Sequence, residues 1–298
     1  MSMGKRKENK GDSTKITREY FDSLLIEMRL IDSDLPSLEY ELFGGVFSTP
    51  VMTAALSHLN RTHPKGMVEL ARGATAANAV MWAGMGDEAE LEQILATGAK
   101  TIKIIKPYAD ENIIMRKIEH AEKHGALAVG MDLDHSFSRR GGYDIVQGYE
   151  MRPKTQTDIL RYTRMTKLPF VIKGVLSTQD ALKCLEADVA GIVVSHHHGI
   201  LSYAVPPLMV LPEIAEAIGG QIPIFVDCAV ESGYDVFKAM ALGANAVSVG
   251  RALMEPLAMG GSEGVKNAIE TISSELAFAM AMTGSADVAS IDPDTIWN

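Results

Sequence analysis

The chain has 298 residues, of which 47% are hydrophobic, and its formal net charge is −10 at pH 7. An acidic protein with a pI of about 5.3 is a poor partner for nucleic acids or anionic membranes, which attract clustered Lys and Arg, so we expect a small-molecule ligand. The two cysteines, Cys184 and Cys228, exclude a disulfide framework, and no run approaches the ~20 apolar residues that span a bilayer. We therefore expect a cytoplasmic protein with no membrane partner.

The N-terminal residues 1–16 are predicted to form a disordered basic tail. Residues 1–15 contain five Lys or Arg and two acidic residues, so they carry +3 and the rest carries −13 (−10 − 3). A solvated tail is favoured over an arm that binds nucleic acid. Residues 17–298 are predicted to form one domain, which opens with a helix in residues 16–30 and a hairpin in residues 35–50 that caps one end.

Eight short apolar runs follow the cap, and each has the length of a strand that is buried on both faces. They are residues 51–55, 79–82, 101–105, 127–132, 170–173, 191–195, 224–227 and 246–250. Helical patterns separate them, such as residues 110–125 and 177–187, and a last helix covers residues 262–282. This alternation predicts an α/β fold, the (β/α)8 TIM barrel. An open doubly wound sheet is the alternative, but the first strand–helix turn lacks the GxGxxG fingerprint.

One connection is much longer than the others. Residues 136–156 are polar and contain Gly141, Gly142 and Gly148 together with three arginines and a proline. A loop of this length in a compact domain is more often a binding loop or lid than a simple connection. Because it follows the fourth strand, we predict an active-site lid.

Polar residues gather at the carboxyl ends of the predicted strands, where barrel enzymes place their chemistry. Lys173 ends a buried strand, and a buried ammonium needs a partner, which could be a Schiff base, an anionic cofactor ring or a salt bridge to Asp227. Gly250 and Arg251 open a helix after the eighth strand, a frequent phosphate site in barrels. These polar residues predict that the active site lies at the carboxyl ends of the strands, on one face of the barrel.

The run His196, His197 and His198 follows the sixth strand. Successive side chains on an extended segment point to opposite faces, so the three rings cannot converge on one metal without a sharp turn. His135 and Asp134 are the nearest further ligands for a zinc site. We predict no metal, and we favour general acid–base chemistry with Asp134 orienting a histidine.

Three stretches, "VIKGVLSTQDALKCLEADVAGIVVSHHHG", "IPIFVDCAVESGYDVFKAMALGANAVSVGRAL" and "ELAFAMAMTGSADVASI", resemble the FMN-dependent α-hydroxy acid oxidases and dehydrogenases, the family of glycolate oxidase and lactate oxidase. The likeness covers residues 40–291. It implies His197 as the catalytic base, Asp134 as its support and Lys173 beside flavin N1 and O2. The positions that it implies for FMN are Thr53, Ala54, Ala55, Lys103, Asp132, Lys173, Ser195, Asp227, Ala229, Gly250 and Arg251.

Several residues depart from the family pattern. Ile200 stands where an arginine binds the substrate carboxylate, and the lid offers only Arg139 or Arg140 near the family's second substrate arginine. Glu231 replaces a phosphate-binding arginine, and Ile105 replaces a tyrosine of the substrate pocket. Ile200 and Ile105 predict a substrate that is less anionic or larger than lactate, whereas Glu231 should repel the cofactor phosphate unless it turns outward.

The resemblance implies an FMN-dependent oxidoreductase that oxidises the CH–OH group of a 2-hydroxy acid or a related hydroxy compound, with His197 as base. It also implies a homo-oligomer, a tetramer or larger. Two alternatives remain open. One is a flavin-dependent isomerase similar to type 2 isopentenyl diphosphate isomerase, and the other is a divergent flavin-binding or ligand-binding barrel without this chemistry.

Overall fold

The computed structural model of the chain describes residues 11–297, so residues 1–10 of the predicted tail lie outside the described residues. The first helix, α1 (Ser13–Ser23), begins inside the predicted tail. Its start is fixed by Asp12, whose side chain accepts hydrogen bonds from the backbone N–H groups of Thr14 and Lys15. The predicted boundary at residue 16 is therefore corrected to an earlier position.

Eight parallel strands form the central sheet, and their neighbours share parallel registers throughout. In sheet order they are β4 (Val51–Thr53), β13 (Ala246–Val249), β12 (Ile224–Val226), β11 (Gly191–Val194), β10 (Phe170–Val175), β7 (Ala128–Asp132), β6 (Thr101–Ile105) and β5 (Met81–Ala83). The two outer strands of this order approach each other through a parallel bridge between Leu56 and Ala83. The sheet thus nearly closes on itself, and the predicted TIM barrel is confirmed.

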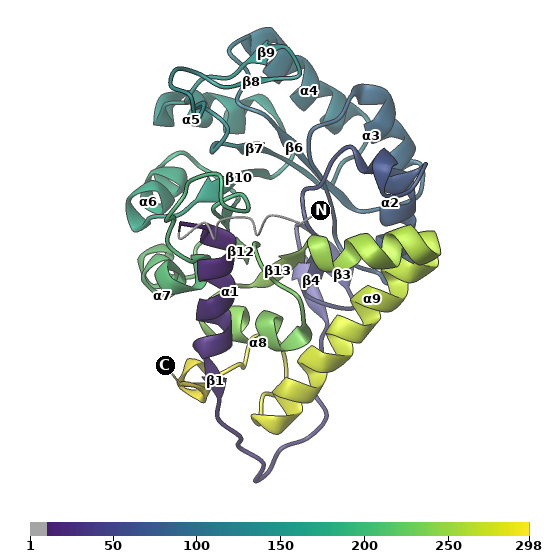
Figure 1. Cartoon of the computed structure of the whole chain (residues 1–298), viewed down its shortest axis with the longest axis vertical. Coiled ribbons are helices and arrows are strands. Elements are labelled where there is room, and N and C mark those ends of the chain that lie inside the picture. Colours follow the sequence, from purple (N-terminus) through teal and green to yellow (C-terminus); the bar gives the residue numbers. More distant parts are fainter. Residues whose placement is uncertain (1–10, 298) are drawn as a thin grey trace, which may run out of the picture.

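Eight helices alternate with these strands and cover the outside of the barrel (Figure 1). They are α2 (Gly66–Ala76), α3 (Glu88–Leu95), α4 (Glu111–Lys123), α5 (Gln156–Met165), α6 (Thr178–Glu186), α7 (Pro207–Ile218), α8 (Gly233–Ala241) and α9 (Met254–Met282). Three short 3-10 helices are η1 (Leu59–Arg61), η2 (Arg251–Leu253) and η3 (Pro293–Thr295). Helix α9 kinks at Gly261, so the predicted last helix corresponds to its longer, second part.

Alternate residues of each strand enter two different apolar layers. The barrel interior is filled by one cluster, which includes Met52, Trp82, Ile102, Ile104 and Phe225. The larger cluster lies between the strands and the helices. This alternation decides which residues at the strand ends face the centre of the barrel.

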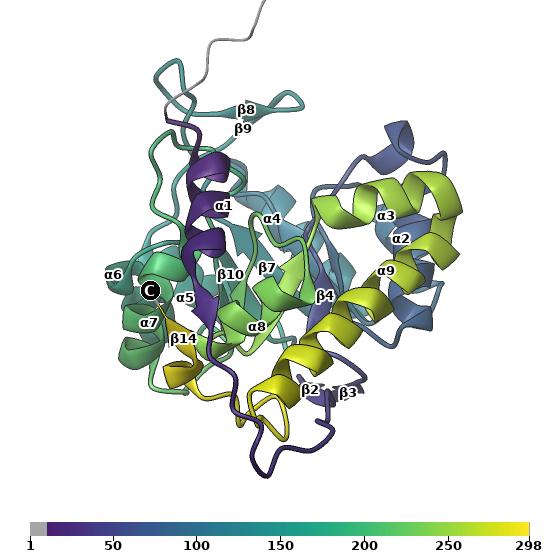
Figure 2. The same ribbon diagram turned by 60° about the horizontal axis from the view of Figure 1, so that its bottom comes forward.

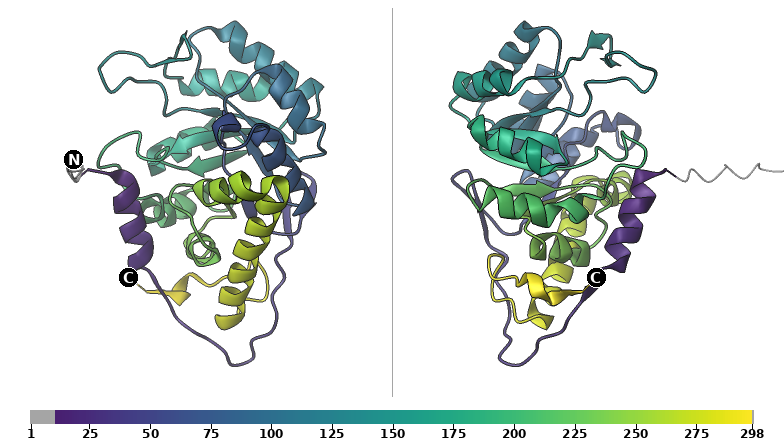
Figure 3. Two further views of the ribbon diagram at one scale, coloured as in Figure 1. Left: turned by 45° about the vertical axis from the view of Figure 1, so that its right-hand side comes forward. Right: turned by 90° about the vertical axis from the view of Figure 1, so that its left-hand side faces the viewer.

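Three two-stranded elements complete the fold. The hairpin of β2 (Tyr40–Leu42) and β3 (Gly45–Phe47) packs its apolar side chains on the interior cluster and closes the lower end of the barrel (Figure 2). Strand β1 (Leu25–Ile26) pairs with β14 (Ile296–Trp297), which joins the two ends of the described chain. Strands β8 (Ile145–Val146) and β9 (Tyr149–Glu150) form a small hairpin in the long connection, residues 136–156, which projects from the barrel (Figures 2 and 3).

Residues 11–297 contain no helix that is both long enough and apolar enough to cross a bilayer.

Candidate active site

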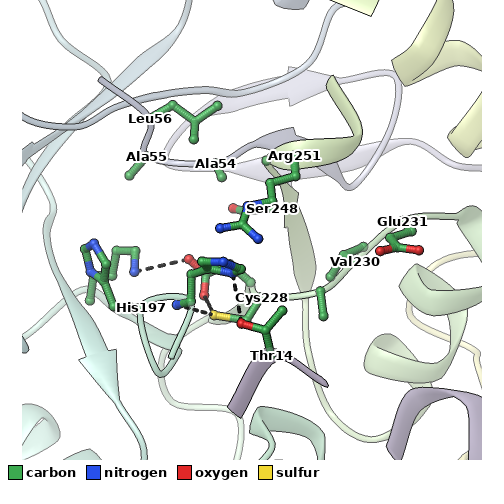
Figure 4. A pocket seen from close by; sticks show the side chains of 15 residues that line it. Thr14, Ala54, Ala55, Leu56, His197, Cys228, Val230, Glu231, Ser248 and Arg251 are labelled. Carbon is green, nitrogen blue, oxygen red and sulfur yellow. Dashed lines mark hydrogen bonds and ion pairs between the residues drawn. The ribbon is translucent and has the colours of Figure 1, made fainter. Parts of the chain in front are cut away.

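A pocket lies at the carboxyl ends of the barrel strands, on the face predicted to carry the chemistry (Figure 4). Eight predicted site residues line it: Ala54, Ala55, Lys173, His197, Asp227, Ala229, Gly250 and Arg251. Its other lining residues are Thr14, Leu56, His198, Cys228, Val230, Glu231 and Ser248. Residues from five strand ends and from α1 therefore share one cavity.

Lys173 is a buried cation in this pocket. Its Nζ lies 3.1 Å from Asp227 Oδ2 and donates a hydrogen bond of 3.0 Å to Ser195 Oγ. Burial alone would lower the pKa of Lys173, but the carboxylates of Asp227, Asp132 and Asp134 raise it above its usual value. The salt bridge to Asp227 that the sequence offered as one partner is present, and the ammonium stays charged while it faces the pocket.

His197 is held by two carboxylates at one ring nitrogen. Its Nδ1 lies 2.8 Å from Asp134 Oδ1 and 3.2 Å from Asp132 Oδ1. The contact with Asp132 has hydrogen-bond geometry, whereas both carboxylate oxygens of Asp134 are buried without a hydrogen bond from the described residues. The Nδ1 proton is thus directed at Asp132, and Asp134 contributes its charge.

The sequence makes room for this arrangement at Gly174, just after Lys173. Gly174 has φ of 95°, and a Cβ atom there would lie 2.6 Å from Asp134 Oδ2. A side chain at this position would push the carboxylate away from His197, and the positive φ would strain it as well. Only glycine keeps both Lys173 and Asp134 in place.

The pKa values of Asp132, Asp134 and His197 shift in different directions, because each side chain lies beside charged neighbours. Burial and the neighbouring Asp132 carboxylate raise the pKa of Asp134 to about 6. Burial alone would lower the pKa of His197, but contacts with Asp132 and Asp134 raise it to about 9. Burial likewise opposes ionisation of Asp132, yet Lys173, His197 and Lys106 hold the pKa of that carboxyl well below its usual range. At neutral pH His197 is therefore an imidazolium between two carboxylates.

The other ring nitrogen of His197 meets a second histidine. His197 Nε2 lies 3.1 Å from His135 Nε2, and His135 Nδ1 lies 3.1 Å from Asp144 Oδ2 in the long connection. Burial, followed by the charges of Lys106 and His197, lowers the pKa of His135. Neutral His135 therefore accepts the Nε2 proton of His197 and donates its own Nδ1 proton to Asp144.

The three consecutive histidines have three different environments, because His197 and His198 both have positive φ, 47° and 54°. Gly199 N–H donates to His196 Nδ1, so His196 Nε2 carries the proton and donates to Thr17 of α1 over 2.7 Å. Burial and the charge of Arg251 lower the pKa of His198 to about 4, and its Nδ1 lies 3.2 Å from Thr14 Oγ1. The turn thus places His196 against α1, His197 beside two carboxylates and His198 at the edge of the pocket.

The turn after β12 shapes the far side of the pocket. Cys228 and Ala229 have φ of 78° and 58°, a left-handed conformation that costs each of them conformational energy. Arg18 of α1 holds this turn, because it donates 2.8 Å hydrogen bonds to the Ala229 carbonyl and to the Asp235 carboxylate. Glu231 lines the pocket at the opposite side from His197 (Figure 4).

Four predicted site residues lie outside the pocket, and three of them have side chains that are engaged elsewhere. Thr53 Oγ1 accepts a hydrogen bond from the backbone N–H of Trp82, and Lys103 donates to the Gly84 carbonyl on the helix side of β6. Arg139 donates to the carbonyls of Gly199 and Ile200, and Arg140 is exposed. None of the four lines the pocket. Asp132 and Ser195 also lie outside the lining, but they contact His197 and Lys173 directly.

Sequence reasoning missed Lys106, Arg18 and the role of His135. Lys106 Nζ lies 2.6 Å from Asp132 Oδ2. The alternation along β6 could have revealed it, since Ile102 and Ile104 face the interior and the same parity reaches residue 106. No sequence signal marks the contact of Arg18 with the turn after β12, because Ala229 and Asp235 lie more than 200 residues away.

The pocket suits an anionic, hydroxyl-rich cofactor such as FMN. Lys173 supplies a buried cation for the flavin ring, Asp227 can accept ribityl hydroxyl protons, and Arg251 supplies a cation for phosphate. A Cβ atom at Gly250 would lie 3.2 Å from Ala54 Cβ, so glycine keeps this wall of the pocket open.

The residues around His197 also form a set that a divalent cation could use. Their donor atoms lie within 4.8 Å of one another, and the set consists of Asp132, Asp134, His135 and His197.

Comparisons with known proteins agree with this geometry. Residues 4–163 and 155–298 match the family profile "FMN-dependent dehydrogenase". Peroxisomal (S)-2-hydroxyacid oxidase GLO4 of Arabidopsis thaliana is 31% identical over 289 residues, which cover 86% of this chain and 79% of the relative. Glycolate oxidase 3 of Oryza sativa subsp. indica is 29% identical over 315 residues, covering 93% and 86%.

Solved structures show the same relationship. A crystal structure of mandelate oxidase superposes with a TM-score of 0.85 at 28% identity, covering 95% of this chain and 89% of that one. A Pediococcus acidilactici protein described as a lactate oxidase gives a TM-score of 0.88 at 27% identity, covering 96% and 86%. The comparisons give no support to the isomerase alternative. The chain is an FMN-dependent oxidoreductase and belongs to the FMN-dependent dehydrogenase family.

Proposed function

We propose that this protein oxidises the CH–OH group of a 2-hydroxy acid or a related hydroxy compound, with His197 as the base that removes the hydroxyl proton. The observation that supports this most is the position of His197. It lines the same pocket as Lys173, and two carboxylates hold its Nδ1. Bound FMN would supply the two-electron acceptor for the reaction.

The charged residues around His197 each stabilise a charge or accept a proton in the proposed reaction. Asp132 and Asp134 stabilise the imidazolium that His197 becomes when it accepts a proton. Lys173 holds a positive charge in the pocket, and this charge would stabilise negative charge on the ring of a bound flavin. A substrate hydroxyl must take the place of His135 at His197 Nε2, because that nitrogen offers one site only.

Substrate selection rests on the residues around Ile200. An isoleucine cannot pair with a carboxylate, and Arg139 donates to the Gly199 and Ile200 carbonyls instead of facing the pocket. We therefore propose a substrate that is less anionic or larger than lactate. The relatives are named for glycolate, lactate, mandelate and (S)-2-hydroxy acids, so these compounds and their esters form the natural test panel.

The test is anaerobic titration of the FMN-loaded protein with this panel while the visible flavin absorbance is followed. We expect bleaching by at least one hydroxy compound and its loss in His197→Ala. His63→Ala, which alters a half-buried loop residue outside the pocket, serves as the matched control and should bleach normally. A protein that binds FMN but is bleached by no compound would refute the oxidase proposal in favour of a divergent flavin-binding barrel. Efficient bleaching by lactate would refute the substrate proposal alone.

Assembly and location also belong to this proposal. We propose a homo-oligomer in the cytoplasm, although the Arabidopsis relatives are named peroxisomal. Light scattering of the purified protein tests the first point, since a monomeric mass at working concentration would contradict it. Fractionation of the native cell tests the second.

A further inference from the structure

A second group of metal-binding side chains lies on the outer surface of the barrel, between α3 and α4. His120 and His124 are four residues apart on α4 and therefore share one face of that helix. Their rings stack, with centroids 4.3 Å apart and planes inclined by 27°. Glu92 of α3 faces both rings across the gap between the two helices. None of the three lines the active-site pocket.

The donor atoms of these residues already converge. Glu92 Oε1 lies 2.9 Å from His120 Nε2 and 3.7 Å from His124 Nε2, and one donor atom of each residue lies within 4.8 Å of the others. Two ligands of a tetrahedral zinc ion, each about 2.0–2.1 Å from the metal, are roughly 3.3 Å apart. The two distances lie on either side of that value, so rotations of the His124 and Glu92 side chains would bring the donor atoms to the spacing of metal ligands.

The three side chains differ in their exposure to solvent, so one ligand is held in place and the other two are accessible to a metal ion. The side chain of His120 is 12% exposed, whereas those of His124 and Glu92 are 32% and 51% exposed. The packing of His120 limits its rotation, which reduces the entropy lost on binding. The exposed Glu92 leaves space for water or another ligand to complete the coordination.

The surrounding charges do not block a cation. The hydrogen bond to His120 is the main cause that lowers the pKa of Glu92, and the charge of Lys123 lowers it less than either histidine does. Arg116, on the same helix, is paired with Glu88 over 2.8 Å. The Glu92 carboxylate and two imidazoles that are neutral when they bind a metal therefore face the gap.

We propose that Glu92, His120 and His124 bind a divalent transition-metal cation such as Zn²⁺, which joins α3 to α4. Two imidazoles and one carboxylate select zinc, nickel or copper over magnesium and calcium, which prefer oxygen ligands. The affinities should follow the usual order, with copper tightest and manganese weakest of the first-row ions tested. This inference does not depend on the oxidase proposal, because the site shares no residue with the pocket.

The experiment is isothermal titration of the full-length, chelator-treated protein with ZnCl2 and, separately, MgCl2. The active-site donors could take up zinc as well, so the titration is carried out on His135→Asn, which weakens that set, and only the binding that His124→Ala or Glu92→Gln weakens is assigned to the proposed site. We expect one zinc per chain in this background and no heat from magnesium. Adding His124→Ala or Glu92→Gln should weaken zinc binding at least tenfold, whereas His63→Ala should leave it unchanged.

Thermal unfolding gives a readout that does not depend on activity. A hundredfold excess of zinc over its Kd should raise the Tm of the His135→Asn protein by about 5 °C, and the rise should disappear with His124→Ala. Unchanged zinc affinity in both the His124→Ala and Glu92→Gln proteins would overturn the proposal. Equal binding of magnesium and zinc would also overturn it.

Discussion

Replacing Asp134 by asparagine should lower the pKa of His197 and move the pH dependence of flavin reduction to lower pH. His197 must be neutral to accept a proton, so the reaction is slow below its pKa and speeds up above it. With a pKa of about 9 in the wild type, only about one molecule in a hundred has a neutral His197 at pH 7. On the acid side of the pH profile, kcat/KM should therefore begin to fall at a pH well above the ordinary histidine pKa of 6.5. We call this fall the acid limb.

The size of the change follows from the contacts. Raising the pKa of His197 from 6.5 to about 9 corresponds to about 3 kcal/mol in favour of the imidazolium, and Asp132 and Asp134 supply it against the opposing effect of burial. Among the contacts that raise this pKa, Asp132 contributes most and Asp134 contributes next. Asp134→Asn should thus move the acid limb down by about one pH unit.

The assay is anaerobic stopped-flow flavin reduction by the best substrate between pH 6 and pH 10. Above the limb the variant should be slower by about tenfold, because the imidazolium that forms is less stable. At pH 7 the larger neutral fraction offsets this loss, so a single-pH assay would miss the effect. Asp144→Asn is the control, because Asp144 contacts His135 and not His197. A limb that stays in place in Asp134→Asn, or a wild-type limb near pH 6.5, would refute the reasoning.

Four further outcomes are expected. Lys173→Met leaves the Asp227 carboxylate buried without its cation and should lower the free energy of unfolding in urea by about 3–5 kcal/mol; a loss below about 1 kcal/mol would contradict this. Ala229→Gly relieves a positive φ of 58° and should raise that free energy by about 1 kcal/mol, and destabilisation would count against strain there. Ile200→Arg should lower KM for lactate by at least about tenfold, whereas an unchanged ratio of lactate to lactate ester turnover would argue against a missing carboxylate contact. Because the folded state raises the pKa of His197, its contribution to stability is full below about pH 6.5 and lost as pH rises through about 9, a loss that should be absent from denaturation curves of His197→Ala.

The barrel itself was predictable because eight buried strands and their helices leave a regular signal in the sequence. The directions of individual side chains were harder to predict, since successive residues of a strand point to opposite faces of the sheet. Lys103 was expected at the cofactor, yet it faces the helices, and Lys106, three residues later, reaches Asp132. Thr53 and Ala54 differ in the same way, and only Ala54 lines the pocket.

The histidine run shows a second limit. An extended segment would point its side chains alternately, and that geometry was the reason for predicting that the three rings diverge. The structure instead contains three successive residues with positive φ, His197, His198 and Gly199, and only the last of them is a glycine that marks the turn in the sequence. His196 is fixed by Thr17, from a helix nearly 180 residues earlier in the chain. Contacts of that range leave no local pattern.

The position of α1 has a consequence for how the protein is made. Thr17 holds the histidine turn, Arg18 holds the turn after β12, and β1 pairs with the last described strand. These partners follow α1 in the chain by at least 179 residues, so they leave the ribosome much later than α1 does. During translation α1 is therefore made before the surfaces on which it packs. The histidine turn gains its support from Thr17 only when α1 packs on the later part of the barrel, so we expect the active site to be completed late in folding.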